Sequence, residues 1–500
     1  MTLADPVELF SRRVKASPDH VAIAEAGRST SYAELANLAA RFAAAFRARG
    51  GRAPRVLIHL PQCAEAYAAM LGSLMAGGIY APNNLSAPAP RQRAVHEAFE
   101  PDVVVAGDGA LEALGIGADD SRRVSPVDLP APLAESAWSA DDLAYVMFTS
   151  GSTGVPKGVM VAREGLAHYT DWALSAMEVR AEDRWSQHPN LGFDLSVLDI
   201  YGALCGGATL VPLARQGDRL TPAAAIRRHN LTIWNSVPSV VDLMIRARQV
   251  TAENLRSLRL LTFCGEPLLP AHLEAIFAAR PDVRVHNTYG PTEATVSCTV
   301  VRLAAADYRD ACRASVALGE PIPGMDIWLE GGESADEGEV VIGGPQVARG
   351  YWRDPERTAA VFGQARRGGV TLRTYRTGDR AARSGRHLFF VERVDRQVKI
   401  LGHRIELGEI DAALRACGAS AACTVLWNGE LHAFIESTGS AALAELRAAL
   451  ATRLPTYAIP GHFHAIAALP RNVNDKADAG ALIAQLAAAG SAAQPEYRAG

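Results

Sequence analysis

The sequence predicts an α/β protein in which a large N-terminal domain of βαβ-type sheets with helices precedes a small C-terminal α+β domain. Short apolar runs alternate with helical stretches over most of the chain, which is typical of βαβ units. Beyond about residue 330 the pattern changes to short strands separated by glycine turns. The length of 500 residues, with 49% hydrophobic and 21% charged residues, is enough for one large and one smaller globular domain.

The elements follow in chain order. Residues 32–50 carry apolar side chains at helical spacing and end at a glycine pair, so they predict an amphipathic helix. Apolar runs predict strands within 55–60, 102–106, 143–149, 208–213, 258–263, 338–344 and 387–402, and a helix is expected at 407–417. We place the domain boundary near Asp395, which divides the chain into 1–394, 395–486 and a flexible tail at 487–500.

Composition excludes several classes of function. The formal net charge of −4 provides no dominant basic surface, so neither nucleic acid nor an anionic membrane is expected as a partner. No signal peptide is recognisable, and no apolar run reaches the ~18 residues of a membrane span, so we expect a cytoplasmic protein. The seven cysteines form no C-x-x-C pair and have no zinc-like spacing with histidine, so free thiols are expected.

A glycine- and hydroxyl-rich segment follows the predicted strand 143–149. It contains Thr149, Ser150, Gly151, Ser152, Thr153, Gly154 and Lys157. Glycines allow backbone N–H groups to approach an anion, hydroxyls add donors, and a lysine adds charge, so the segment predicts a phosphate-binding loop. Only four of the fifty basic residues are lysines (Lys15, Lys157, Lys399 and Lys476), which draws attention to Lys157. The glycine spacing and Pro156 distinguish the loop from a Walker A motif.

TSGSTGVPKG (149–158) resembles the phosphate loop of the adenylate-forming (ANL) superfamily. Further segments similar to that family follow in the same order over nearly the whole chain: SYAEL (31–35), LMAGG (74–78), NTYGPTE (287–293), GEVVIGGPQVARGY (338–351), YRTGD (375–379), QVKILGHRIELGEI (397–410) and NDK (474–476). FDLSVLDIY (193–201) and FCGE (263–266) are similar to stand-alone amino-acid ligases, namely D-alanine:carrier-protein ligases and the amino acid:acyl-carrier-protein ligases of polyketide pathways.

The resemblance implies ATP-dependent activation of an amino acid to aminoacyl-AMP with release of pyrophosphate, and it implies ATP and Mg²⁺ as cofactors. It assigns Tyr289 to the adenine face, Thr292 to the α-phosphate and Glu293 to Mg²⁺, and an aromatic plane, a hydroxyl and a hard oxygen suit those roles. The whole implied ATP site is Thr149, Ser150, Gly151, Ser152, Thr153, Gly154, Lys157, Gly265, Glu266, Pro267, Asn287, Thr288, Tyr289, Gly290, Thr292, Asp379, Arg393 and Lys476. Asp379 is expected to accept the ribose hydroxyls. Glu392 stands where the family has glycine before Arg393.

Catalysis is assigned by the same resemblance to Lys476, Thr149, Lys157 and Glu293. Lys476, carried by the small domain, would bridge the substrate carboxylate and the α-phosphate, where an ammonium stabilises two converging anions. Asp475 replaces the usual glycine before it. In this family the small domain is mobile, and it turns about a hinge before a thioester is formed in a second step. By resemblance the hinge is Asp395, and Lys399 and Gly402 serve the thioester step.

The substrate is inferred from Asp194, a carboxylate among apolar neighbours that needs a cation. By resemblance it binds the α-ammonium of an amino acid, and the side-chain pocket is Leu195, Leu198, Asn235, Thr262, Cys264, Thr288, Val296 and Ser297, with Lys476 on the carboxylate. These residues are small or medium and uncharged, so the sequence predicts a small neutral amino acid, alanine first, in either the L or the D form.

Two further expectations concern partners and alternatives. Twenty-four residues follow Lys476, so we expect no attached carrier domain and transfer of the aminoacyl group to the phosphopantetheine of a separate carrier protein. An acyl- or aryl-CoA ligase on the same fold is the first alternative, and Asp194 disfavours it. A catalytically inactive scaffold that binds a carrier or nucleotide is the second, and the intact set of candidate catalytic residues disfavours it.

Overall fold

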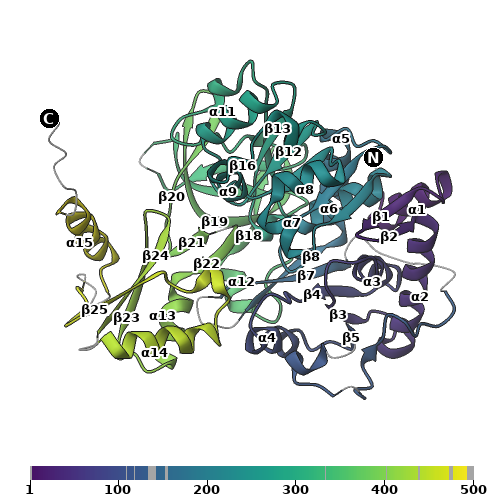
Figure 1. Cartoon of the computed structure of the whole chain (residues 1–500), viewed down its shortest axis with the longest axis horizontal. Coiled ribbons are helices and arrows are strands. Elements are labelled where there is room, and N and C mark those ends of the chain that lie inside the picture. The colour runs from purple at the N-terminus through teal and green to yellow at the C-terminus, as the bar shows by residue number, and fades with distance from the viewer. Residues whose placement is uncertain are drawn as a thin grey trace. The chain divides into compact units, whose positions relative to one another are not determined.

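The computed structural model describes residues 3–107, 110–117, 119–132, 142–151, 156–332, 334–400, 402–436, 440–471 and 477–492. The chain forms two compact units, whose elements are labelled in Figure 1. The first unit consists of Met1–Leu85, Val95–Thr149 and Lys157–Asp395. The second consists of Ser86–Ala94, Ser150–Pro156 and Arg396–Gly500.

The first unit is built around a mixed sheet with the strand order β15-β14-β13-β12-β11-β9-β10-β1-β2. Its inner strands from β13 to β1 pair in parallel, and β15, β14 and β2 pair antiparallel at the edges. The bounds are β1 Val21–Glu25, β2 Arg28–Ser31, β9 Arg184–Gln187, β10 Thr209–Pro212, β11 Ile233–Ser236, β12 Leu260–Phe263, β13 Arg284–Tyr289, β14 Thr299–Leu303 and β15 Glu320–Pro321.

Neighbouring residues along these parallel strands enter two different hydrophobic cores. Leu210 and Ile233 belong to one core, while the next residues, Val211 and Trp234, belong to the other. Because successive side chains of a strand point to opposite faces, the sheet is covered on both sides. One core includes residues of α1 Pro6–Ala16, α2 Tyr32–Gly50, α3 Ala64–Met75, α5 Arg163–Ala176 and α6 Leu195–Gly206, and the other includes residues of α8 Pro222–His229, α9 Ser239–Arg246, α10 Ala252–Leu255 and α11 Pro270–Ala279.

A second sheet has the order β6-β5-β3-β4-β7-β8 and shares the first of these cores. Its strands are β3 Arg55–His59, β4 Ile79–Pro82, β5 Val103–Ala106, β6 Arg123–Val124, β7 Leu143–Thr149 and β8 Lys157–Ala162. A third, antiparallel sheet has the order β16-β17-β19-β18 with β20 paired to β19. Its strands are β16 Asp326–Glu330, β17 Glu337–Gly343, β18 Phe362–Arg367, β19 Val370–Ser384 and β20 His387–Arg393. Three helices not yet named are α4 Ala89–Phe99, α7 Gln216–Leu220 and α12 Pro355–Val361.

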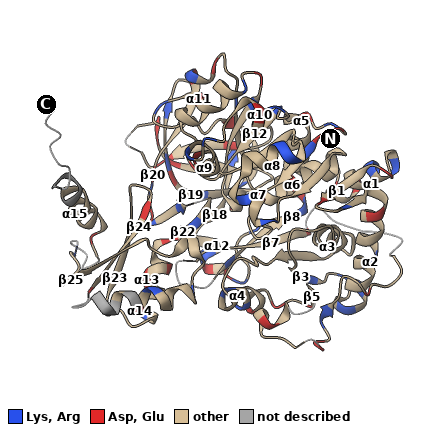
Figure 2. Cartoon of the chain, in the orientation of Figure 1, with Lys and Arg blue, Asp and Glu red and all other residues tan. Residues whose placement is uncertain are grey.

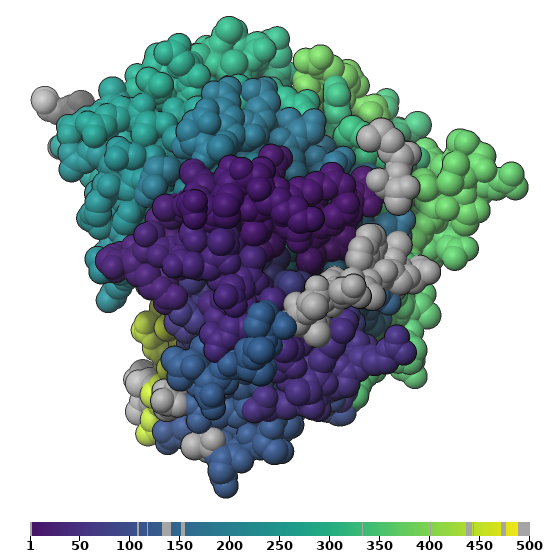
Figure 3. Space-filling view, turned by 90° about the vertical axis from the view of Figure 1, so that its right-hand side faces the viewer, coloured from purple at the N-terminus to yellow at the C-terminus, as the bar shows by residue number. Residues whose placement is uncertain are grey.

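The helix expected at residues 32–50 forms as α2 with the same bounds, because its first turn is capped reciprocally. The Ser31 hydroxyl accepts the backbone N–H of Glu34, and the Glu34 carboxylate accepts the backbone N–H of Ser31. Polar anchors tie the N-terminal helices to α6 and to the turn after it: Arg13 Nε donates to the Cys205 carbonyl at 3.0 Å, and the Tyr32 hydroxyl donates to the Ala208 carbonyl at 2.8 Å. Figure 3 shows the N-terminal part of the chain, in purple, beside a blue segment that follows it in the sequence.

The second unit contains the hairpin β21 Gln397–Ile400 and β22 His403–Glu406, and a sheet of β23 Ala422–Trp427, β24 Glu430–Glu436 and β25 His462–Ile466. Its helices are α13 Leu407–Ala416, α14 Ser440–Ala451 and α15 Ala479–Ala492. Helices α13 and α14 contribute to the core on one face of the sheet, and α15 contributes to the core on the other. Helix α15 continues past Leu486 into the segment for which a tail was expected, because this stretch is rich in alanine, the strongest helix former.

The prediction of an α/β protein with several sheets and a small α+β part is confirmed. All seven cysteines are free. Among the described helices, none combines the length and the apolar character that a membrane crossing requires. Figure 2 shows acidic and basic residues interspersed along the described elements.

Candidate active site

The carboxyl end of β7 carries the first candidate. Thr149 is the last residue of β7, and its backbone pairs with that of Lys157 at the start of β8. Its hydroxyl oxygen is buried and has no hydrogen-bond partner among the described residues. Because a buried hydroxyl without a partner is costly, Thr149 is suited to receive a polar ligand atom.

A buried cation and a buried carboxylate meet beside this strand end. Lys157 Nζ lies 3.8 Å from Glu293 Oε1, and their side chains are 8% and 0% exposed. The Tyr351 hydroxyl donates to the same Glu293 oxygen at 2.7 Å, and the Lys157 ammonium lies 5.3 Å from the centre of the Tyr351 ring. Burial of a lone charge is strongly unfavourable, so each of the two charges stabilises the other in this position.

Asp194 lies beside Thr292, the residue that precedes Glu293 in the chain. The Thr292 hydroxyl donates to Asp194 Oδ2 at 2.6 Å, and both residues are buried. Asp194 occupies the N-cap position of α6, but its side chain makes no capping hydrogen bond to that helix. The carboxylate is therefore directed to Thr292 instead of serving the helix.

A further group connects the end of β13 with β19 and β20. The Tyr289 hydroxyl donates to Asp379 Oδ2 at 2.6 Å, and Arg393 forms an ion pair with Asp379 Oδ1. Arg393 also pairs with Asp395 at 2.6 Å. Burial, followed by the nearby Asp379 carboxylate, raises the pKa of Tyr289 well above its ordinary value, so its hydroxyl remains a proton donor. Glu392, the departure from the family pattern, pairs with Arg380 across the strands at 3.5 Å.

Asn235 and Thr262 of the expected substrate pocket belong to a buried hydrogen-bond network. Thr262 Oγ1 donates to Asn235 Oδ1 at 2.8 Å, and Asn235 Nδ2 donates to Asp199 Oδ1 at 2.8 Å and to the Leu195 carbonyl at 3.3 Å. Trp185 Nε1 also donates to Asp199 Oδ1, at 3.0 Å. The Asn235 amide nitrogen therefore donates to two partners within the protein.

Asp199 carries a buried carboxyl group in the same network. It is 0% exposed, and burial raises its pKa well above the ordinary value, an effect that the hydrogen bonds from Asn235, Trp185 and the His188 backbone oppose. Its Oδ1 atom accepts both of the side-chain bonds.

Asp199→Asn is expected to reduce the pH dependence of stability. In the wild-type protein the native state keeps the Asp199 carboxyl proton at pH values where an unfolded aspartate, with a pKa of about 3.9, has lost it. The stabilisation is complete below that pH and is lost as the pH rises towards the raised native value, with a limiting slope of about 1.4 kcal/mol per pH unit. Asparagine keeps the acceptor oxygen and has no proton to lose.

Urea unfolding between pH 5 and 8 measures this effect. The midpoint of the wild-type protein should fall more steeply with pH than that of Asp199→Asn. Asp171→Asn, which removes an exposed carboxyl group from α5, should keep the wild-type slope. Equal slopes for wild type and Asp199→Asn would contradict a neutral Asp199.

A strained turn lies at Val296, another residue of the expected substrate pocket. Thr295 and Val296 have φ values of +55° and +70°, which β-branched residues rarely adopt. Buried Gln346 holds this turn, since its side-chain amide nitrogen donates to the Ser297 carbonyl at 3.1 Å and its main-chain carbonyl accepts the Thr295 hydroxyl at 2.7 Å. Such strain persists only where surrounding contacts hold it, and it is common at functional sites.

The remaining predicted residues of the first unit occupy the same region of the fold. Thr288 Oγ1 donates to the Phe263 carbonyl at 3.0 Å, Ser297 exchanges a 3.2 Å hydrogen bond with Tyr169, and Cys264 Sγ lies 3.8 Å from the Val296 carbonyl. Leu195 and Leu198 are buried in α6, and Asn287 donates to the Ala317 carbonyl at 2.9 Å. Glu266 accepts the backbone N–H of Ser239 at 3.0 Å, at the start of α9.

Glycine is required at Gly290 by close packing of the backbone. A Cβ atom at this position would lie 2.4 Å from the Cα atom of Ser297. Gly265 has a φ of +96°, in the region that glycine adopts most readily. Pro267 follows Glu266 in the loop between β12 and α11.

In the second unit, the Ser150 hydroxyl donates to the Arg404 carbonyl at 2.7 Å, and Gly151 is described beside it. Lys399 lies in β21 opposite Arg404 of β22, and Gly402, with a φ of +77°, lies in the turn of this hairpin. The candidates Ser152, Thr153, Gly154 and Lys476 lie outside the described residues.

Several site residues were not predicted from the sequence. Tyr351 and Gln346 lie in a segment that resembles the family, but nothing in their spacing indicates contacts to Glu293 and Thr295. Asp199 lies in an apolar stretch of the sequence and was not singled out. A carboxyl group with apolar neighbours on both sides is a signal that would have identified it as a buried acid.

The donor set fits the cofactors that the family resemblance implies. Glu293 provides a buried carboxylate oxygen, the hard ligand that Mg²⁺ prefers, and Lys157 beside it provides a cation for a phosphate. The unpartnered Thr149 hydroxyl provides a further donor at the strand end.

Comparison with known proteins gives consistent matches. The profile of a family described as AMP-binding enzyme matches residues 10–352. The L-proline–[L-prolyl-carrier protein] ligase of Pseudomonas fluorescens is 32% identical over 94% of this chain and 97% of its own. The D-alanine–D-alanyl carrier protein ligase of Listeria monocytogenes is 33% identical over 72% of each chain. The solved Vibrio cholerae adenylation domain AlmE, in complex with glycyl-adenosine-5'-phosphate, has a TM-score of 0.84 with 28% identity over 98% of each chain.

Proposed function

This chain belongs to the family of AMP-binding enzymes, and we propose that within this family it is an amino acid:carrier-protein ligase. It would activate a small neutral amino acid, alanine first, to aminoacyl-AMP with release of pyrophosphate. It would then transfer the aminoacyl group to the phosphopantetheine thiol of a separate carrier protein. The relatives named for proline and D-alanine carrier-protein ligation, together with the glycyl-adenylate complex, support an amino acid as substrate.

The observation that carries the proposal is the buried carboxylate of Asp194. It is 4% exposed, it makes no cap for α6, and it accepts the Thr292 hydroxyl at 2.6 Å. A substrate ammonium would form an ion pair with this carboxylate, which a fatty or aromatic acid cannot do. The partner hydroxyl, on Thr292, would then lie between the amino-acid site and the α-phosphate of ATP.

The pocket favours a small and uncharged side chain. The Asn235 amide nitrogen donates to Asp199 and Leu195, and the Thr262 hydroxyl donates to Asn235. A charged or strongly polar substrate side chain would find few free partners at these two residues. A methyl group requires none, which supports alanine without deciding between its L and D forms.

The adenosine and phosphate groups of ATP have separate candidate partners. Asp379 would accept the ribose hydroxyls, with Arg393 and Tyr289 holding the carboxylate in place. Thr149, Lys157 and the loop that follows β7 would contact the phosphates. Glu293 would hold Mg²⁺, which neutralises phosphate charge when it is bound.

Adenylate formation needs the carboxylate oxygen to attack the α-phosphorus while pyrophosphate leaves. We assign Lys476 to the charge between these two groups. For the second step, the small domain would turn about Asp395 and present Lys399 and Gly402 to the pantetheine. The first unit ends at Asp395, and Gly402 lies in the turn of the hairpin that follows, both of which support this assignment.

ATP–pyrophosphate exchange across the proteinogenic amino acids, D-alanine and β-alanine tests the proposal. Alanine is expected to give the highest rate, with glycine and serine within about 10–200-fold, because one methylene or hydroxyl is worth only about 1–3 kcal/mol in such a pocket. Propionate, which lacks the ammonium, should be a very poor substrate. A strong response to octanoate or benzoate with none to alanine would instead indicate an acyl- or aryl-CoA ligase, and no exchange with any acid would indicate an inactive scaffold.

A further inference from the structure

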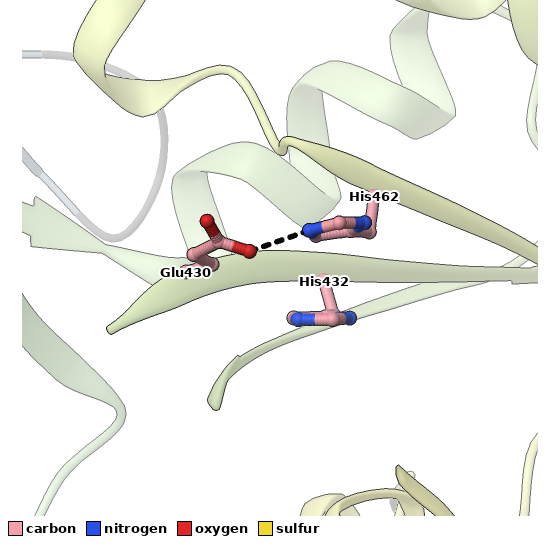
Figure 4. A group of neighbouring side chains, drawn as sticks. All are labelled: Glu430, His432 and His462. Atoms are coloured by element: carbon pink, nitrogen blue, oxygen red, sulfur yellow. Dashed lines mark hydrogen bonds and ion pairs between the residues drawn. The ribbon is translucent and has the colours of Figure 1, made fainter. Parts of the chain in front are cut away.

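A group of imidazole and carboxylate side chains lies on one face of the β23–β24–β25 sheet, apart from the candidate active-site residues. Glu430 and His432 come from β24, and His462 comes from β25. One ligand atom from each of the three lies within 4.8 Å of the other two. Figure 4 shows Glu430 hydrogen-bonded to His462, with the two imidazole rings lying parallel.

Strand pairing explains why these side chains meet. Strands β24 and β25 are parallel, and His432 is the register partner of His462. Side chains two residues apart share a face of a strand, so Glu430 lies beside His432, and His464 beside His462. The intervening Leu431 and Ala433 belong to the core on the opposite face.

His464 would add a fourth ligand, the third imidazole nitrogen. His432 Nδ1 and His464 Nε2 are 3.0 Å apart, and His462 Nε2 lies 2.6 Å from Glu430 Oε2. Two ligands of one tetrahedral zinc ion, with bonds of about 2.0–2.1 Å, lie about 3.3 Å apart. Each of these two pairs would separate by less than an ångström to hold an ion, and the ligand atoms of Glu430, His432 and His462, which lie within 4.8 Å of one another, would approach by at most about 1.5 Å.

We propose that Glu430, His432, His462 and His464 form a binding site for a zinc-class divalent metal ion. Three imidazole nitrogens and one carboxylate oxygen are the donor set that zinc and its neighbours prefer, whereas Mg²⁺ prefers oxygen alone. The site is distinct from Glu293, and it does not rest on the proposed ligase function.

The surroundings support this assignment. His432 is 5% exposed and packs edge-on against Trp427, while His464 stacks on Phe434, so two of the four ligands are held by aromatic neighbours. A bound ion would connect β24 to β25, whose sequence positions are about thirty residues apart.

Zinc binding by the full-length chain without a histidine tag tests the proposal. After removal of metal with a chelator, titration calorimetry with Zn²⁺ alone should show this site in the wild type and also in a Glu293→Gln variant, which keeps all four proposed ligands. Co²⁺ in place of Zn²⁺ should give the visible absorption of a tetrahedral site. His462→Ala, at an exposed position, should weaken this affinity at least about tenfold, since even outer partners of metal ligands are worth 10–100-fold.

Two further variants keep the test sharp. His432→Phe retains an aromatic ring in the stack and removes the nitrogens, so it should also lose the site while it remains folded. His387→Ala removes a histidine from β20, outside the cluster, and should bind as the wild type does. No binding to the wild type, or equal binding by His462→Ala, His432→Phe and wild type, would overturn the proposal.

Discussion

Asp194→Ala is expected to lower kcat/KM for the amino acid by about 30- to 4,000-fold, because loss of one partner from a buried charge pair costs about 2–5 kcal/mol. The substrate ammonium would enter a site where no other carboxylate is assigned to it. ATP affinity should change little, since Asp194 reaches the proposed nucleotide site through the hydroxyl of Thr292 and is not itself assigned to ATP. Pyrophosphate exchange with varied alanine, and separately with varied ATP, measures the two effects.

Two variants separate charge from hydrogen bonding at this position. Asp194→Asn keeps an acceptor for the Thr292 hydroxyl and removes the charge, so it should be nearly as impaired as Asp194→Ala. Thr292→Val removes the same hydrogen bond from the other side and keeps the carboxylate, so the KM for alanine should be affected less than that for ATP. An unchanged KM for alanine in Asp194→Asn would tell against the ammonium assignment.

Glu293→Gln is expected to lower exchange with every amino acid by about 10²-fold or more and to raise the Mg²⁺ concentration needed for half-maximal activity. The substitution removes a hard oxygen ligand and leaves Lys157, with a side chain 8% exposed, without its buried counter-charge. Catalytic groups that act on developing charge commonly contribute about 10²–10³ in kcat. A magnesium titration of the exchange rate measures the effect.

Tyr351→Phe is the matched control for this prediction. It removes the 2.7 Å hydrogen bond to Glu293 but keeps the carboxylate and the aromatic ring below Lys157. Its loss should therefore be much smaller than that of Glu293→Gln, and its magnesium dependence should resemble that of the wild type. If both variants lost activity equally, with no change in magnesium dependence, Glu293 would be only a structural partner of Tyr351.

Local sequence signals predicted the parts of the fold that depend on neighbouring residues. Helix α2 and strand β7 formed with their expected bounds, because a capping box and an uninterrupted apolar run are both local features. The family relationship was also evident from segments of the chain, and the profile match confirmed it. The expected roles of the individual site residues remain predictions.

What could not be predicted depends on pairing between distant segments. No spacing rule connects Tyr351 with Glu293, or Gln346 with Thr295, because β-sheet packing brings them together. The absence of zinc-like spacing in the sequence likewise gave no hint of His432 and His462, which meet through the parallel pairing of β24 with β25. A search for metal-binding motifs finds ligands that are close in the sequence. This group of side chains comes from two strands that are far apart in the sequence and adjacent in the sheet.

The left-handed turn at Thr295 and Val296 also bears on how the enzyme could be redesigned. The hydrogen bonds with Gln346 connect this turn to a segment 51 residues further along the chain. Glycine at Val296, a proposed pocket residue, would remove side-chain volume and also relieve the torsional strain of the positive φ. Substitutions at Gln346 would instead remove the hydrogen bond that its side chain donates to this turn, although Gln346 is not itself one of the proposed pocket residues.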